Sequence, residues 1–169
     1  MPVDARVQHF TRVVRRAFRT FANVFDNATF WYVRGQGLLV GGERAVPIDL
    51  GRLRERLADQ SVAADLSSID IEGAEQLLAH LLMGPRQIQA YLAQSPDQVL
   101  NTDDKAYLEY HTPFEFLRTT KDVLTALVPH AGFDDTVLVN ASAQDRAAVR
   151  AAWDARRQRV LAELDEPLR

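Results

Sequence analysis

Apolar positions near the start of the chain first recur at helical spacing and then form short apolar runs that are typical of strands. Between residues 6 and 23 they fall at three- and four-residue steps with arginines between them, which predicts an amphipathic helix. Its apolar face comprises Val7, Phe10, Val14, Phe18 and Phe21. The aromatic and β-branched run 28–33 and the apolar run 37–41 predict two strands. Arg34-Gly35-Gln36 between them can close a hairpin.

From Pro47 onward the pattern is mainly helical. Asp49 is a suitable N-cap for a helix with Leu50, Leu53 and Leu57 on one side. A leucine-rich stretch at 72–83 predicts a second helix, which Gly84-Pro85 stops. Pro85 then opens a third helix, whose apolar positions are Ile88, Tyr91 and Leu92.

Two further helices complete the predicted pattern. One runs from Phe114 to about Val128 and ends at Pro129. The other begins at Ser142 with Asp145 as its capping-box partner, and its apolar face comprises Val149, Trp153, Val160 and Leu164. Tyr107 to His111 is predicted to be extended. We therefore predict an α+β fold that is mainly helical, divided into a helix and hairpin at 1–46, a helical region at 47–115 and a helical tail at 116–169.

Composition narrows the classes that this chain can belong to. The hydrophobic content of 47% and charged content of 25% are ordinary for a folded protein. Absence of cysteine excludes disulfides and thiolate metal sites. No run of 18 apolar residues occurs, so we expect no membrane span. The absence of cysteine favours a cytoplasmic location. The acidic side chains gather at 61–135, which carries 12 of them against four basic ones. This field would attract cations, or it is simply a solvated acidic surface.

The histidines and the N-terminal arginines give weaker functional signals. The four histidines lack the spacing of a metal site, so no metal is expected. The arginines between Arg6 and Arg19 could meet phosphate, but they also occupy the positions of a solvated helix face. Because no aromatic stacking pattern is interleaved with them, we expect no nucleic-acid binding.

The segment from Asn101 to Pro113 is the strongest candidate for a binding site. Its carboxylates can hold ammonium groups by charge-assisted hydrogen bonds, and its tyrosine rings can hold them by cation–π contact. The candidate amine-binding residues are Asp103, Asp104, Glu109, Tyr107 and Tyr110. The alternative is that Asn101 to Asp104 only cap and turn the backbone, since all four residue types favour that role.

This segment and four short sequence motifs before it resemble the C-terminal portion of spermidine synthase-like proteins, especially bacterial forms fused to a membrane region. The motifs follow one another in the same order as in that family. The first motif is Phe21-Ala22-Asn23-Val24-Phe25, and the second is Ala28-Thr29-Phe30-Trp31 together with Leu38-Leu39-Val40-Gly41. The third is Ile48-Asp49-Leu50, and the fourth is Leu82-Met83-Gly84-Pro85. The similarity covers residues 7–115. Ala106 departs from it, because the family usually has proline there. The resemblance implies that residues 1–46 form the end of a class-I methyltransferase-like sheet.

The resemblance also implies a chemistry, which is aminopropyl transfer from decarboxylated S-adenosylmethionine to a polyamine. The family's glycine-rich donor loop and catalytic aspartate match no position here, so we assign no catalytic, cofactor-binding or metal-binding residue. Gly35-Gln36-Gly37 and Gly41-Gly42 lead into no helix and are interpreted as turn glycines. The chain is therefore expected to be inactive alone. It would be a C-terminal part of such a protein, whose parent can be membrane-attached, or a non-catalytic binding module derived from that fold.

An interaction through the N-terminal region is also expected. The two predicted strands lack the rest of the sheet that they resemble, and Phe10, Phe18, Phe21 and Trp31 need cover. We therefore expect self-association or docking onto a methyltransferase-like chain or domain, besides the binding of a polyamine.

Overall fold

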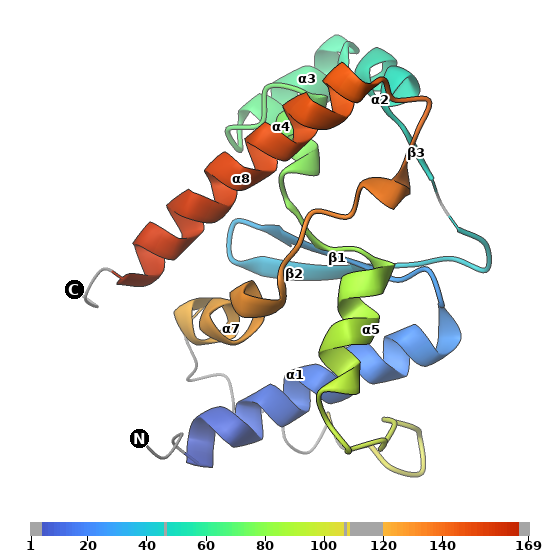
Figure 1. Ribbon diagram of the computed structural model, residues 1–169, viewed down its shortest axis with the longest axis vertical. Coiled ribbons are helices and arrows are strands. Elements are labelled where there is room, and N and C mark those ends of the chain that lie inside the picture. The colour runs from blue at the N-terminus through green and yellow to red at the C-terminus, as the bar shows by residue number, and fades with distance from the viewer. Residues whose placement is uncertain (1–4, 46, 107, 109–119, 166–169) are drawn as a thin grey trace.

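The fold is α+β and mainly helical, as predicted. The computed structural model describes residues 5–45, 47–106, 108 and 120–165. Among these, a small sheet lies between two groups of helices (Figure 1). The lower group comprises α1 (Ala5–Val24), α5 (Pro85–Ala93) and α7 (Thr120–Leu127). The upper group comprises α2 (Leu50–Leu57), α3 (Gln60–Ser67), α4 (Ala74–Leu78) and α8 (Ala143–Asp165).

The predicted helix and hairpin at the start of the chain are confirmed. Helix α1 leads into the antiparallel strands β1 (Thr29–Val33) and β2 (Gln36–Val40). Arg34 and Gly35 form the turn between them with φ of 45° and 87°. Two successive positive φ angles match the right-handed twist of a hairpin, which is why a glycine is suited to this turn.

The predicted helix at 72–83 is wrong in its second half. Helix α4 ends at Leu78, and β4 (Leu81–Met83) is a strand that pairs antiparallel with β1. Leu81 and Met83 are almost fully buried while Leu82 is less so, which is the alternation of a strand. The free edge of β1 supplies the reason, because the backbone N–H of Tyr32 donates to the carbonyl of His80 at 2.9 Å. Tertiary pairing therefore overrides the local helical preference.

Strand β1 separates two apolar cores. Phe30 and Tyr32 point into the core beneath the sheet, where Phe18 of α1 lies 4.8 Å from the Phe30 ring. This core also draws on β4, α5, α7 and α8 through Met83, Ile88, Tyr91, Leu124, Leu127 and Val160. Trp31 points to the opposite side and packs on the second core, which includes Leu50 and Val149. Strand β1 is thus covered on both faces by helices of this chain.

The helix starts follow the predicted capping chemistry. Asp49 caps α2 by accepting from the N–H of Arg52 at 3.0 Å, and Ser142 and Asp145 form the capping box of α8. Pro85 opens α5 as expected. Two short strands, β3 (Ile48–Asp49) and β5 (Leu138–Val139), pair in parallel and bring the starts of α2 and α8 together.

The region predicted as the helix 114–128 is described only from Thr120. Helix α7 ends at Leu127, and the 3₁₀ turn η2 (Val128–His130) contains Pro129. A second 3₁₀ turn, η3 (Asp135–Val137), precedes β5. Of the segment predicted to be extended at 107–111, only Leu108 is among the described residues, and its backbone is helical rather than extended.

A buried carboxylate joins α5 to the loop before β5. Asp134 is fully buried, and it accepts hydrogen bonds from Arg86 at 2.6 Å and from the N–H and hydroxyl of Thr136. Burial alone would raise the pKa of Asp134, but these hydrogen bonds outweigh it and the pKa lies below its ordinary value. Gly84 leaves the room for this group, since a Cβ there would lie 2.5 Å from the Asp134 side chain.

Candidate functional site

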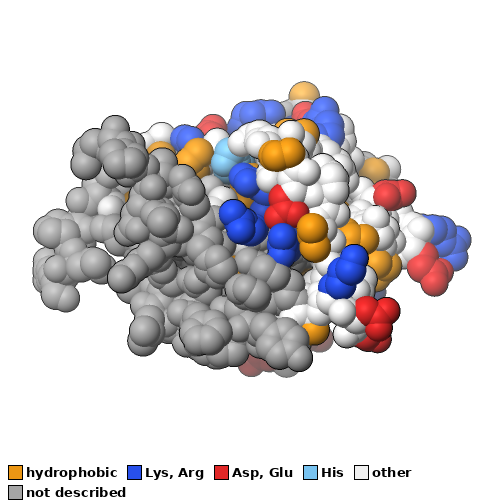
Figure 2. Space-filling view, turned by 90° about the horizontal axis from the view of Figure 1, so that it is seen from below, with side chains coloured by type: hydrophobic (Ala, Val, Ile, Leu, Met, Phe, Trp, Pro, Cys, Tyr) orange, Lys and Arg blue, Asp and Glu red, His pale blue; other side chains and the backbone are white. Residues whose placement is uncertain are grey.

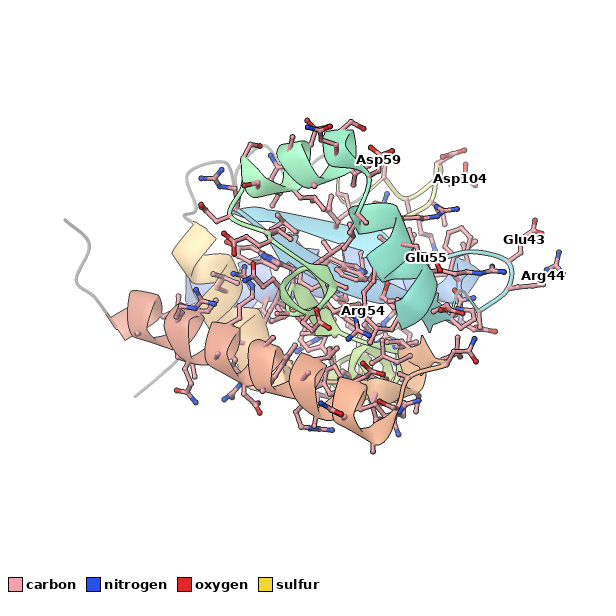
Figure 3. All side chains as sticks on the ribbon, turned by 90° about the horizontal axis from the view of Figure 1, so that it is seen from above. Glu43, Arg44, Arg54, Glu55, Asp59 and Asp104 are labelled. Atoms are coloured by element: carbon pink, nitrogen blue, oxygen red, sulfur yellow. The ribbon has the colours of Figure 1, made fainter. Side chains whose placement is uncertain are left out.

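The acidic segment forms a turn at the surface. Thr102 and Lys105 pair across the turn through backbone hydrogen bonds of 2.9 and 3.3 Å, and Asp103 and Asp104 stand exposed at its tip. Asp104 extends away from the body of the protein (Figure 3). Within the described residues neither carboxylate makes a hydrogen bond or an ion pair. Both are therefore open to a cation from solvent.

Asn101 anchors this turn to the rest of the molecule. Its backbone N–H donates to the Thr20 hydroxyl on α1 at 2.8 Å, and its side-chain oxygen accepts from the N–H of Leu108, also at 2.8 Å. The backbone-turning role considered for Asn101 and Thr102 is thus present. The other three candidate residues, Tyr107, Glu109 and Tyr110, lie outside the described residues, so their positions relative to the two aspartates stay a prediction.

A second polar site, which the sequence does not indicate, lies between the hairpin, α4 and α8. It is a cavity of about 800 Å³ with His80 in its wall. His80 is 9% exposed, and its Nδ1 lies 2.8 Å from the carbonyl oxygen of Tyr32. Burial lowers the pKa of His80, and the nearby charges of Arg156 and Arg159 lower it further, despite the hydrogen bond to Tyr32.

These contacts fix the chemical form of His80. A carbonyl oxygen only accepts, so Nδ1 carries the proton and the neutral ring keeps its lone pair on Nε2. The cavity wall also holds the carboxylates of Asp70 and Glu72, besides the guanidinium groups on α8. Such a site can accept a proton or a hydrogen bond from a small polar molecule. No local signal could have revealed it, because the partners of His80 come from positions 48 and 76 residues away in the chain.

The outer edge of β2 is a third candidate, for binding another strand. The sheet order is β2-β1-β4, so among the described residues β2 pairs on one side only. Leu38 lies opposite Trp31 and Val40 opposite Thr29. In a hairpin closed by a two-residue turn these are the hydrogen-bonded pairs, so the backbone groups of Gly37 and Leu39 point outward.

Apolar side chains accompany this edge. Leu38 is 48% and Val40 49% exposed, whereas Leu39 packs against the core beneath the sheet. The predicted need for cover is smaller than expected, since α5 and its neighbours already bury Phe18 and partly bury Phe21. The exposed apolar surface of the hairpin is thus concentrated on β2 itself.

Known proteins add no identity to these three sites. Comparisons with protein-family models, curated proteins and solved structures returned no match. None of the described helices combines the length and apolar character that a membrane span needs. The described residues also include no group of three or more histidine or carboxylate side chains placed to hold a metal ion.

Proposed function

We propose that this chain is the C-terminal part of a spermidine synthase-like protein and acts as a non-catalytic module that completes a methyltransferase-like sheet. The observation that carries the proposal is the outer edge of β2, which no described strand pairs with. A strand of another chain or domain would add there and extend the order β2-β1-β4 by one or more strands.

The geometry around the edge supports docking of a strand. The hairpin is held from behind, because β4 pairs with β1 and both faces of β1 are covered. The edge is therefore presented in a fixed position, and little ordering entropy remains to oppose docking. Natural sheets protect edges with charges, prolines or bulges, yet β2 has none of these and instead exposes Leu38 and Val40.

Aminopropyl transfer would then need a donor site from outside these 169 residues. The glycines nearest to a nucleotide-binding pattern do not form one, because Gly35 lies in the hairpin turn and Gly37 lies within β2. A phosphate- or nucleotide-binding glycine loop would instead lead from a strand into a helix. The acidic turn at Asp103 and Asp104 would contribute to the amine side of the complete site.

The proposal can be tested by charging the edge. Leu38→Lys with Val40→Lys places two cations along β2 without altering its backbone pairing, and edge lysines oppose strand addition. Val62→Lys with Val99→Lys is the matched control, since these residues are also exposed, at 38% and 40%, and lie outside the hairpin. Binding partners are a second copy of this chain and a spermidine synthase-like domain truncated before its last hairpin.

Association is measured by sedimentation equilibrium over a concentration series. The parent and the control should associate with one of the two partners, and the edge variant should lose that association. If the parent binds neither partner, or if the edge variant binds as well as the control does, β2 is not a docking edge and the proposal is wrong.

A further inference from the structure

The underside of the molecule carries a pocket with an excess of positive charge. It has a volume of about 710 Å³ and lies between α1 and the chain that follows α5. The described residues in its wall include Arg12, Arg15, Arg16, Arg19, Ser95 and Asp97. Figure 2 shows basic side chains gathered around an acidic one on this face. All four arginines lie on α1, where their spacing of three and four residues places them side by side.

Among the described residues of this wall, Asp97 is the only carboxylate, and it is already engaged. Asp97 accepts from Nε of Arg16 at 3.0 Å and from the N–H of Val99. Burial alone would raise the pKa of Asp97, but these hydrogen bonds and the nearby arginines keep the pKa below its ordinary value. The carboxylate is thus ionised at neutral pH. Among the described residues it offsets one of the four guanidinium charges, which leaves three in excess.

Within the described part of the chain, Arg15 and Arg19 are positioned by contacts other than carboxylates. The Arg15 guanidinium lies 4.7 Å from the ring centre of the fully buried Tyr91. Arg19 donates to the Gln98 side chain at 2.6 Å and to the Leu92 carbonyl at 2.8 Å. Stacking and hydrogen bonds to uncharged groups therefore hold Arg15 and Arg19 in place, and no described carboxylate pairs with them.

Some donors in the pocket remain unused. Nε of Arg15 and Nε of Arg19 are buried without a hydrogen-bond partner, and a buried donor without a partner is unfavourable. Arg12 is exposed and makes no ion pair with any described residue. An anion in the pocket would pair with the guanidinium groups, because the fork of a guanidinium matches the oxygens of a phosphate.

We propose that this pocket binds the phosphate groups of a small phosphorylated molecule. Three excess charges suit a ligand with more than one negative charge, such as a diphosphate, better than a monocarboxylate. The volume lies within the range of small-molecule sites and leaves room for a group beyond the phosphates. The backbone carbonyls at the C-terminal end of α5 would repel an anion. Arg19 already donates a hydrogen bond to the carbonyl of Leu92, which reduces this repulsion.

The test uses pyrophosphate as the probe and the full chain as it exists. Binding is measured by isothermal titration calorimetry at constant ionic strength, so that general screening is equal in all samples. The pocket variant is Arg12→Gln with Arg15→Gln. The control is Arg44→Gln with Arg56→Gln, which removes the same charge from exposed positions outside the pocket. Arg44 lies on the loop after β2 and points outward (Figure 3).

Pyrophosphate should bind the parent saturably at one site. Each pocket arginine removed should weaken binding by roughly tenfold, whereas the control should change it less than about twofold. Because Arg15 packs on Tyr91, the single variant Arg12→Gln serves as a second test that leaves this packing intact, and it should also lose roughly tenfold. A parent that does not bind pyrophosphate would overturn the proposal, as would equal losses in pocket and control variants. Binding of a single-stranded oligonucleotide without binding of pyrophosphate would also overturn it.

Discussion

Replacing Asp134 with asparagine should destabilise the fold far more than the same change at its neighbour. The asparagine keeps the shape of the side chain but removes the charge that accepts from Arg86 and Thr136. Converting charge-assisted hydrogen bonds to neutral ones costs about 1–1.5 kcal/mol. The new amide N–H₂ would be buried facing donors, which costs about 1–3 kcal/mol more.

The expected loss is therefore about 2–4.5 kcal/mol, or a fall in Tm of roughly 5–15 °C for a chain of this size. Asp135→Asn is the matched control. Its carboxylate is 43% exposed and lies 3.6 Å from Arg86, so its loss should cost less than about 0.5 kcal/mol. Differential scanning calorimetry and urea unfolding measure both variants. Equal changes in the two variants, or a loss below about 1 kcal/mol for Asp134→Asn, would refute the reasoning.

The same carboxylate predicts a pH dependence. Because the pKa of Asp134 is lowered in the folded state, its contribution is complete at neutral pH and is lost as the pH falls below its ordinary pKa toward the folded value. Asp145 acts in the same direction, since hydrogen bonds from Ser142 and Arg54 lower its pKa to about 2. The free energy of unfolding of the parent should thus fall between about pH 4 and pH 2. That of Asp134→Asn should fall less.

Three further outcomes are expected. If Asp103, Asp104 and Glu109 bind amines, a polyamine should raise the Tm of the parent, and the rise should be smaller in high salt. The triple variant Asp103→Asn, Asp104→Asn, Glu109→Gln should abolish this rise. A rise in Tm that survives the triple change would exclude the site. Purified chain with putrescine and decarboxylated S-adenosylmethionine should release no methylthioadenosine above a heat-killed control, and measurable release would contradict its non-catalytic role. Ser142→Ala should cost about 1 kcal/mol through the lost cap of α8. Ser67→Ala, at an exposed position whose side chain makes no hydrogen bond to a described residue, should be nearly neutral in urea unfolding.

Local chemistry made much of this fold predictable. The hairpin follows from an aromatic run and a turn glycine that are adjacent in sequence, and the caps at Asp49 and Ser142 act over three residues. Strand β4 was not predictable in this way, since a leucine-rich run suits a buried helix and a buried strand equally. The free edge of β1 decided between them, and β1 lies about 50 residues earlier in the chain.

The candidate sites also differ in whether they are formed by residues that are close in sequence or by residues from distant elements. The turn at Asn101 and Thr102 is formed by neighbours in sequence, so its backbone role could be anticipated. The cavity around His80 could not, because Tyr32 and Arg156 reach it from distant elements. The arginines of α1 show both cases. Their spacing predicts one shared face, but only the folded chain shows which of them Asp97 neutralises.

The most direct test of the account is amide hydrogen exchange along β2. The N–H groups of Gly37 and Leu39 point outward from the hairpin, while those of Leu38 and Val40 already pair with β1. On mixing with a spermidine synthase-like domain truncated before its last hairpin, exchange at Gly37 and Leu39 should slow strongly and exchange at Leu38 and Val40 should change little. Unchanged exchange at Gly37 and Leu39 while the two proteins bind each other would contradict sheet completion through β2.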